Sequence, residues 1–589
     1  MAKKVKKINP KTKKMINIIS SLLYFIFCFI ALLLTINIFK LNMLPFKITF
    51  LIFTFGIICI LIFGLLCLHK KIKWKIKIIS DVMVLILSVI LFFANHYIDR
   101  TISFFREITG SNYEVENYYV LVLDESDLSS ENDLLDKKVG YVGKLGNNDK
   151  ALEELKNKVV FETVNNKSIF DLGNALLKKQ TDAILLADYH KAILDEQIED
   201  FDDKTKIIYQ FSIKKETKVE SNSVNVTKDS FNIFLSGIDT YGEIDSIARS
   251  DVNMIITINP VTKQVLLTSI PRDYYVELSC YNEKDKLTHA GMYGIDCSIG
   301  TIENLLGIDI NYYARVNFSS LINLVDVLGG VEVYSDYTFN TYGYQFNKGY
   351  NYVNGKYALA FSRARYNFVD GDRQRVKNQQ AVITAIVNKA MSPAILSKYT
   401  SILDSLKDSF QTNMGMSDIQ SLAKFQIDKM PKWNIASISL NGSDSENYTY
   451  SYGSQKLYVM EPDISTVDYA RETINKVMKG EAIDVANTQT QIVSNSNQTI
   501  SKATTTTPIK STTKTTTTKV PTTKVPTTTS IKKEENDNVN KPNNTEDSNG
   551  DFNQEDNKEN TSDSNTDENQ VDNDKSETLE NSDDKKQDN

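Results

Sequence analysis

Hydrophobic residues concentrate near the start of the chain and are almost absent from its end. Three apolar segments, each long enough to cross a bilayer, cover residues 16–39, 48–68 and 78–98. The third segment carries one acid, Asp81, near its start. A secretory signal peptide would be a single, shorter apolar run. The pattern therefore predicts three transmembrane helices within residues 16–98.

Lysines flank these segments unevenly. Seven lysines precede the first segment and five lie between the second and the third, whereas the loop after the first segment holds only Lys40 and Lys47. By the positive-inside rule, residues 1–15 form a basic cytoplasmic N-terminus, and the chain after the third segment lies outside the cell membrane.

Residues 111–226 alternate between strand-like and helix-like patterns. The stretches KKVGYVGKL and TDAILLAD have the apolar runs of short strands, and residues 149–157 and 168–179 have helical periodicity. This alternation is typical of a βαβ unit, so we expect a small accessory α/β domain. Its charged residues are scattered, and docking or spacing is the default role.

Residues 229–480 have the pattern of a second α/β domain. The stretches SFNIFLSGID, VNMIITINP and KQVLLTSIP predict three consecutive apolar strands. Helical periodicity follows in SIGTIENLLG, SSLINLVDVLGG and VKNQQAVITAIVNKAM, interleaved with the strand-like INYYARVNF and GVEVYS.

The last part of the chain, residues 485–589, is rich first in Thr, Lys and Pro and then in Asn, Asp, Glu and Ser. Such a composition buries too little apolar surface to offset chain entropy, so we expect a disordered tail. Nineteen acidic and seven basic residues lie within 532–589, while the whole chain has a net charge of −7. The acidic balance therefore belongs to the tail, and an extended spacer and a passive solubilising segment remain alternatives for it.

Two of the five cysteines lie outside the apolar segments. Cys280 and Cys297 are close in sequence, and an oxidising exterior permits a disulfide between them. Two independent buried thiols are the alternative, and the sequence favours the bridge.

Charged residues gather at the predicted strand ends of the second domain. Asp239 follows the first strand, Arg249 and Asp251 lie where the second begins, and Arg272 and Asp273 follow the third, directly after Pro271. The loop FSRARYNFVDGDRQRVKNQQ supplies a further group: Arg363, Arg365, Asp370, Asp372, Arg373 and Arg375. Ligands of open α/β sheets bind in the crevice beyond the strand ends.

Several arginines with a few aspartates suit a pyrophosphate ligand. Guanidinium groups bind phosphate oxygens in bidentate fashion, and carboxylates hold Mg²⁺, which also bridges phosphates. The spacing of Arg363 and Arg365 places both side chains on one face if that segment is extended. Taken singly, each arginine is more readily explained as a surface ion-pair partner, and the clustering is what favours a ligand site.

Other catalytic patterns are missing from the sequence of this domain. It has no glycine-rich P-loop, no Gly-x-Ser-x-Gly elbow and no histidine pair with metal-ligand spacing. Its one histidine, His289, fits a capping or packing role better than that of a base.

Five segments of residues 231–391 resemble the LytR-CpsA-Psr family of bacterial cell-wall enzymes. They are, in order, SGIDTYG, ARSDVNMIITINPVTKQVLLTSIPRD, KLTHAGMYG, YYARVNFSSLINLVDVLGGVEV and ALAFSRARYNFVDGDRQRVKNQQ. The three apolar segments and the accessory domain resemble the capsule-type branch of the family. The resemblance implies a mixed central sheet flanked by helices, with an apolar pocket for a lipid chain.

The resemblance also implies an activity. A Gram-positive, multi-pass membrane phosphotransferase would move a teichoic acid, capsule or related glycopolymer from a polyprenyl-pyrophosphate carrier to peptidoglycan through a phosphodiester. The cofactor would be Mg²⁺, with Mn²⁺ as the alternative, and no nucleic acid would take part. A polyprenyl-pyrophosphate hydrolase would need the same site, and a non-catalytic wall-assembly regulator or binding protein is the alternative of another class.

Roles carry over to positions of this chain as expectations. Asp239 and Asp251 would coordinate the metal, and either could be the general base. The expected catalytic residues are Asp239, Asp251, Arg272, Arg363 and Arg365. The expected substrate-binding residues are Arg249, Arg272, Asp273, Arg363, Arg365, Arg375 and Gln379, with Asp273 orienting Arg272. The chain departs from the family pattern at Tyr241 and Asn378, where family members commonly have arginine.

Overall fold

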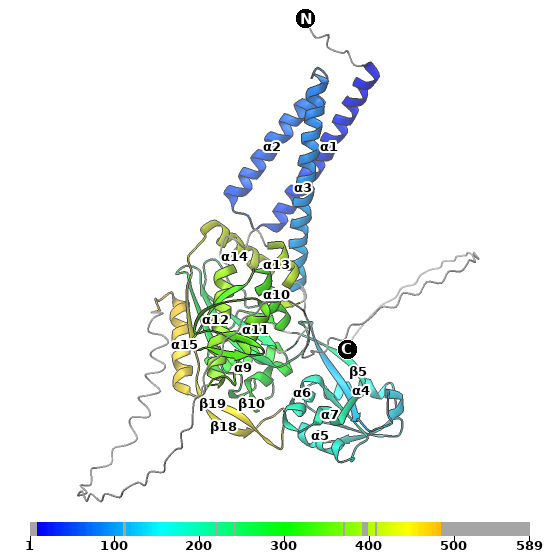
Figure 1. Ribbon diagram of the computed structural model, residues 1–589, viewed down its shortest axis with the longest axis vertical. Helices are drawn as coiled ribbons and strands as arrows, with labels where there is room; N and C mark the ends of the chain where they lie inside the picture. Colours follow the sequence, from blue (N-terminus) through cyan, green and yellow to red (C-terminus); the bar gives the residue numbers. More distant parts are fainter. Residues whose placement is uncertain are drawn as a thin grey trace, which may run out of the picture. The chain divides into compact units, whose positions relative to one another are not determined.

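The computed structural model describes residues 9–109, 113–217, 221–238, 240, 243–368, 371–390, 399–406 and 409–483 (Figure 1). Asp239, Tyr241, Asp370 and the predicted disordered tail, residues 485–589, lie outside the described residues. Among the described residues, three helices are long and apolar enough to cross a membrane, as predicted: α1 (Pro10–Leu41), α2 (Phe46–Leu68) and α3 (Trp74–Ile108).

Polar contacts join the apolar helices α1 and α3. Ser20 Oγ of α1 donates to Asp81 Oδ2 of α3 at 2.8 Å, and Lys77 Nζ donates to Asn17 Oδ1 at 2.8 Å. Such hydrogen bonds stabilise helix association where lipid supplies no hydrophobic driving force. Helix α3 is longer than the predicted segment at both ends, because Lys77 is satisfied within the bundle and the last turns remain apolar through Ile108.

The accessory domain contains a five-stranded sheet in the order β3-β2-β4-β1-β5. Its strands are β1 (Tyr113–Leu123), β2 (Lys138–Tyr141), β3 (Glu162–Asn165), β4 (Ala183–Ala187) and β5 (Thr205–Glu216). Its helices are α4 (Asn148–Lys156), α5 (Ile169–Leu177), α6 (Asp188–Gln197) and α7 (Phe201–Lys204), with a 3-10 turn at Glu131–Leu134. Strand β2 runs parallel to β3 and β4, and β1 runs antiparallel to β4 and β5. The expected α/β domain is confirmed.

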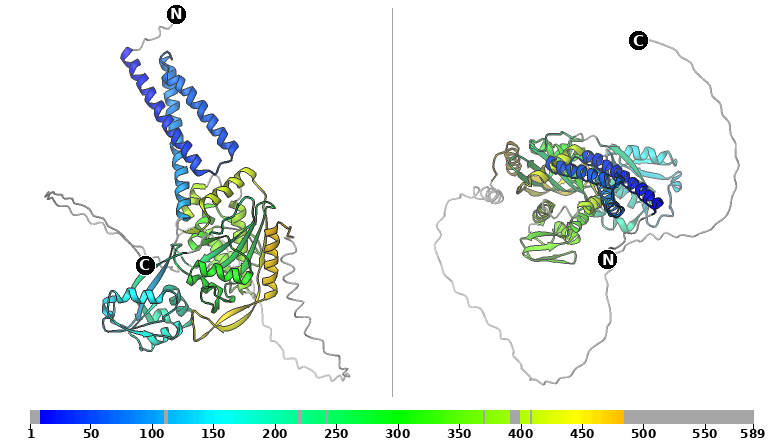
Figure 2. Two further views of the ribbon diagram at one scale, coloured as in Figure 1. Left: turned by 180° about the vertical axis from the view of Figure 1, so that it is seen from behind. Right: turned by 90° about the horizontal axis from the view of Figure 1, so that it is seen from above.

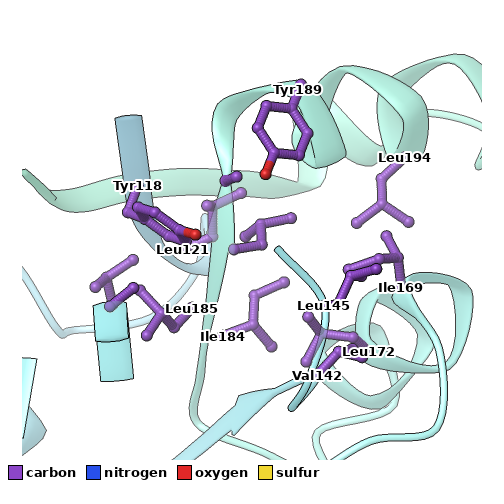
Figure 3. Close-up of a cluster of buried hydrophobic side chains, with 14 of the residues drawn as sticks. Tyr118, Leu121, Val142, Leu145, Ile169, Leu172, Ile184, Leu185, Tyr189 and Leu194 are labelled. Atoms are coloured by element: carbon purple, nitrogen blue, oxygen red, sulfur yellow. The ribbon is translucent and has the colours of Figure 1, made fainter. Parts of the chain in front are cut away.

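Apolar side chains from the strands and helices of this domain form one core. Leu121, Ile184 and Leu185 of the central strands pack near Leu172 of α5 and Leu194 of α6, and all five are essentially inaccessible to solvent (Figure 3). Burial of this kind supplies the main driving force for a small domain.

The second domain contains a six-stranded sheet in the order β16-β11-β6-β7-β8-β17. Its strands are β6 (Phe231–Ile238), β7 (Ser250–Asn259), β8 (Gln264–Ile270), β11 (Tyr312–Val316), β16 (Phe410–Thr412) and β17 (Asn434–Ser439). The pairs β11–β6 and β8–β17 are parallel, and the other three are antiparallel. The predicted mixed sheet is therefore confirmed.

Helices cover both faces of this sheet because apolar residues alternate between its faces. On one face, Ile302 of α9 (Ile295–Leu306) and Ile474 of α15 (Ile464–Lys479) share a core with Ile255. On the other, Ile383 of α12 (Gly371–Ala390) contacts the cluster containing Met254, and α14 (Met416–Lys429) covers β6 and β11. Helix α15 runs beside the green strands in Figures 1 and 2.

The remaining strands form two-stranded ribbons outside the central sheet. They are β9 (Tyr275–Glu277) with β10 (Lys284–Lys286), β12 (Val331–Ser335) with β15 (Gly349–Val353), β13 (Phe339–Thr341) with β14 (Tyr344–Phe346), and β18 (Gly442–Tyr448) with β19 (Lys456–Pro462). The other helices are α8 (Leu287–Ala290), α10 (Phe318–Val327), α11 (Gly355–Arg363) and α13 (Tyr399–Leu406), with a 3-10 turn at Gly291–Tyr293. Strand β12, predicted among the strands of this domain, lies in a ribbon because Glu332 and Tyr334 face solvent.

Candidate active site

Three segments with charged residues meet at one edge of the six-stranded sheet. Strand β7 is antiparallel to both neighbours, so its start lies at the same edge as the ends of β6 and β8. Ile238, the last residue of β6, pairs with Ser250, and Ile270, the last residue of β8, pairs with Asn253. The topology therefore brings the residues around the start of β7 close to the residues that follow β8.

Pro271 marks the end of β8. Proline has no N–H group for the strand ladder, and the chain turns here, with the Tyr274 N–H donating to the Pro271 carbonyl at 3.2 Å. Arg272 and Asp273 lie within this turn. A rigid strand end thus holds both charged residues at the sheet edge.

Arg272 and Asp251 form the central ion pair of this edge. Arg272 Nη1 donates to Asp251 Oδ1 at 2.6 Å, and the two side chains are 19% and 22% exposed. Thr288 Oγ1 lies 3.5 Å from the same carboxylate oxygen, and the Thr288 N–H donates to the Arg272 carbonyl at 2.8 Å. Both members of the pair remain accessible to a ligand.

The charges of three arginines reach Asp251. Burial raises the pKa of the Asp251 carboxyl, but the charges of Arg272, Arg375 and Arg249, with the hydrogen bond from Arg272, lower it below its usual range. Asp251 is therefore ionised, and positive charge surrounds it. An arginine-rich environment of this kind suits an anionic ligand.

Asp273 contacts Arg272 and is almost fully buried. Its Oδ2 is 3.5 Å from Arg272 Nε, and its Oδ1 accepts a hydrogen bond from Lys286 Nζ at 3.2 Å. Burial raises the Asp273 pKa, but the charges of Lys286 and Arg272 outweigh burial and lower it to about 2. The structure places Asp273 against Arg272, and its expected orienting role stays a prediction. Lys286 was not predicted, although it opens the motif KLTHAG.

Arg249 contacts a residue of the accessory domain. Its Nη1 donates to Glu196 Oε1 of α6 at 2.8 Å, and the arginine side chain is 14% exposed. Sequence reasoning did not find Glu196, because a surface glutamate on a helix of another domain carries no local signal.

Comparison with known proteins identifies the family. The family model described as LytR_cpsA_psr family matches residues 201–465. A curated relative from Enterococcus faecalis, named polyisoprenyl-teichoic acid–peptidoglycan teichoic acid transferase TagU, is 36% identical over 215 residues, which are 36% of this chain and 70% of the relative. A protein of the same name from Bacillus mycoides is 36% identical over 210 residues, 35% of this chain and 68% of the relative. The chain belongs to the LytR-CpsA-Psr family.

A solved structure is also similar to part of this LytR-CpsA-Psr chain. The crystal structure of B. subtilis TagV shares 27% sequence identity and covers 44% of this chain and 99% of its own, with a TM-score of 0.36.

In this LytR-CpsA-Psr chain, Arg363 and Arg365 flank the end of a helix. Arg363 is the last residue of α11, so the condition of an extended segment for the Arg-x-Arg pair is not met. The Arg363 guanidinium lies over the rings of Phe318 and Tyr342, at 4.6 and 5.4 Å from their centroids, and Arg365 lies 5.7 Å from the ring of Tyr366. The structure places these two arginines against aromatic rings, and their expected phosphate contacts stay predictions.

Helix α12 supplies the last of the predicted site residues. Arg375 is 8% exposed, and its charge reaches Asp251 and Asp273, whereas Gln379 is half-buried one turn further on. Asn378 is buried, and its Nδ2 donates to the Phe361 carbonyl of α11 at 3.1 Å. The departure at Asn378 thus replaces a common family arginine by a residue that joins two helices.

The described carboxylates fit a metal shared with a substrate better than an all-protein metal centre. Asp239 lies outside the described residues, and no group of three His, Cys, Asp or Glu side chains within the described part could hold a metal ion. Mg²⁺ is commonly bound by one or two carboxylates together with substrate phosphates. The ionised carboxylate of Asp251, beside arginines that are expected to bind phosphate, fits this donor set.

Two other sequence expectations concern His289 and the two cysteines outside the apolar helices. His289 is 3% exposed and its Nδ1 lies 2.6 Å from Asp285 Oδ1 and 2.7 Å from Ser451 Oγ, which agrees with a packing role. Cys280 and Cys297 form a disulfide with their Cα atoms 5.3 Å apart.

The apolar pocket implied by the family resemblance stays a prediction. A surface cavity of about 420 Å³ lies at the opposite end of β6, near Asn232, and includes Glu303, Asp309 and Asn475 in its lining. These polar side chains do not suit a prenyl chain.

Proposed function

We propose that this chain is a membrane-anchored phosphotransferase. It moves an anionic or capsular glycopolymer from a polyprenyl-pyrophosphate carrier to peptidoglycan through a phosphodiester bond. The observation that carries the proposal is the Arg272–Asp251 pair at an accessible edge of the sheet. The charges of Arg249 and Arg375 also act on Asp251. Family membership supports the same reaction class.

The proposed arrangement of the chain follows from its lysines and its apolar helices. The N-terminus is cytoplasmic, and the domain with the site lies outside the membrane. Three apolar helices of the lengths observed hold the domain at the surface where a prenyl-linked substrate is anchored. The lipid-linked donor and the enzyme then encounter each other by diffusion within the same membrane.

Arg249, Arg272 and Arg375 bind the pyrophosphate oxygens, and Arg363 and Arg365 extend the positive surface. Asp273 holds Arg272 in place through the contact at its Nε. Asp239 and Asp251 would hold Mg²⁺, which would neutralise charge on the pyrophosphate. Most of the rate arises from positioning and charge stabilisation, as in other phosphoryl transfers.

The bond changes are balanced. A sugar hydroxyl oxygen of peptidoglycan attacks the polymer-side phosphorus, and the bond from that phosphorus to the bridging oxygen breaks. Polyprenyl phosphate leaves with the bridging oxygen, and the hydroxyl proton passes to a base. Of the two candidate bases, Asp251 is the less suited, because its Oδ1 already accepts a hydrogen bond from Arg272.

The polymer remains to be chosen by experiment. Teichoic acid is the first polymer to test, because both relatives described above carry that substrate in their names. A capsular glycan is the second, on the resemblance of the three-span anchor and accessory domain to the capsule-type branch.

The test uses the full-length protein in detergent with a prenyl-pyrophosphate-linked oligosaccharide, peptidoglycan oligomers and Mg²⁺, with products identified by mass spectrometry. A glycan joined to peptidoglycan through phosphate is the expected product. Release of free glycan phosphate alone would favour the hydrolase. A donor that binds tightly but remains unchanged would favour a non-catalytic binding protein.

A further inference from the structure

The start of strand β1 is buried against the domain that carries the proposed site. Glu114 is fully buried and forms an ion pair with Arg315 of β11, which is 2% exposed. The Ile295 N–H at the start of α9 also donates to Glu114 Oε1 at 3.2 Å. Separating a buried pair of this kind leaves an uncompensated charge, so the pair holds β1 in one register on the second domain.

The next residue of β1 holds the loop that leads to Arg249. The Val115 N–H donates to the Asp245 carbonyl at 2.7 Å, and the Ile247 N–H donates to the Val115 carbonyl at 2.7 Å. These two bonds lie on either side of Ser246, which forms an isolated parallel bridge with Val115. The backbone shortly before Arg249 is therefore fixed by the accessory domain.

The side chain of Arg249 is held from the same domain. Glu196 Oε1 accepts a hydrogen bond from Arg249 Nη1 at 2.8 Å, with the glutamate 54% exposed and the arginine 14% exposed. Arg249 directly precedes Ser250, the first residue of β7, and lies two residues before Asp251. Glu196 therefore holds a guanidinium at the sheet edge that carries the Arg272–Asp251 pair.

We infer that Glu196 is a positioning residue, which orients Arg249 toward the pyrophosphate and makes the accessory domain a working part of the active site. A guanidinium has five N–H donors in a rigid fork, and the bond to Glu196 fixes the direction in which that fork points. Holding the side chain before the substrate arrives reduces the entropy lost on binding. The inference rests on the proposed function, because it requires a pyrophosphate at this edge.

The test measures binding of geranyl pyrophosphate, with Mg²⁺, to the full-length protein in detergent by isothermal titration calorimetry. Glu196→Gln is expected to weaken binding about fivefold, the upper range for an exposed ion pair. In the Arg249→Ala background the same substitution is expected to have no further effect, because its target is gone. Glu199→Gln removes the same charge three positions along the chain and is expected to bind like the native protein.

Each other outcome overturns the inference. An equal loss from Glu196→Gln in both backgrounds would show a merely structural role, and unchanged or tighter binding would show that Glu196 does not prepare Arg249 for the ligand. A native protein that fails to bind geranyl pyrophosphate removes the proposed function, and the inference falls with it. If only the inference about Glu196 is wrong, the native protein still binds geranyl pyrophosphate.

Discussion

Arg272 and Asp251 are joined by a hydrogen bond of 2.6 Å between residues 21 positions apart in the chain. The contact is a direct result of the antiparallel pairing of β7 and β8, which puts the start of one strand beside the end of the other. A permanently charged guanidinium therefore lies next to a carboxylate at the sheet edge. The same edge receives the charges of Arg249 and Arg375, which leaves it able to attract an anion.

Replacement of Arg272 by alanine should reduce transfer by a factor on the order of 10² to 10³, the usual effect of losing one preorganised charge-stabilising donor. The fold should remain, because the Asp251 side chain is already 22% exposed in the native protein and two other arginines stay close enough to compensate its charge. Initial rates and thermal melting of the detergent-solubilised protein measure the two effects separately.

Arg373→Ala is the control for Arg272→Ala. Arg373 bonds instead to Asn441 Oδ1 at 2.7 Å and to the Gly442 carbonyl at 2.9 Å. We expect near-native transfer from this variant. Equal losses from both substitutions would mean that positive charge in general, rather than the Asp251 edge, supports the activity.

Asp273 should contribute stability that depends on pH. Its folded pKa of about 2 lies below the value of about 3.9 for an unfolded aspartate, so the unfolded chain binds more protons between these values. The contribution is therefore complete above about pH 4 and is lost as the pH falls toward 2, with a size of roughly 2 kcal/mol. Asp273→Asn should melt at a lower temperature than the native protein at pH 7, with the gap narrowing below pH 4. A gap that stays constant with pH would contradict the assignment.

His190 should make the protein sensitive to acid. Burial lowers its pKa to about 3, helped by the nearby His289, and neither ring nitrogen has a hydrogen-bond partner among the described residues. Below the unfolded pKa of about 6.5, His190 binds a proton in the unfolded state but not in the folded state. Stability should therefore fall by up to about 1.4 kcal/mol per pH unit between about 6.5 and 3.

The variant His190→Leu tests this acid sensitivity. Melting temperatures measured at pH 7.5 and 5.0 should differ less for this variant than for the native protein. His96→Leu, which changes an exposed histidine of α3, should keep the native difference. A native-like pH dependence in His190→Leu would show that other groups cause the acid sensitivity.

The disulfide closes a short loop of the second domain. Cys280 and Cys297 are 17 positions apart, and a loop of this size corresponds to about 3 kcal/mol of stabilisation. Dithiothreitol should lower the melting temperature of the native protein and leave a Cys280→Ser, Cys297→Ser variant unchanged. Cys28→Ser, which removes a free cysteine of α1, should respond to dithiothreitol like the native protein.

Local patterns predicted much of the fold. The apolar run before Pro271 corresponds to β8, and the apolar stretch TDAILLAD corresponds to β4. In each case every residue of the strand is buried, so a continuous apolar run in the local sequence marks it. The sequence also predicted that charged residues gather at the strand ends, and the antiparallel pairing of β7 and β8 brings two of them, Asp251 and Arg272, into contact.

Contacts between distant segments could not be predicted in this way. Glu114 and Arg315, like Glu196 and Arg249, belong to different domains, and only the packing of those domains brings them together. Lys286 opens the motif KLTHAG, in which only His289 was considered as a functional residue. The structure shows that Lys286 is the residue of this motif that donates a hydrogen bond to Asp273. Its role depends on the turn after β8, which no pattern around Lys286 encodes.

The fate of the polymer-side phosphorus decides whether the protein transfers the polymer to peptidoglycan. A prenyl-pyrophosphate-linked oligosaccharide carrying phosphorus-32 at that position is incubated with the full-length protein, Mg²⁺ and peptidoglycan oligomers. We expect label in the peptidoglycan product with the native protein and almost none with Arg272→Ala. Label that remains with the prenyl product, or appears only in free glycan phosphate, would contradict the proposed transfer.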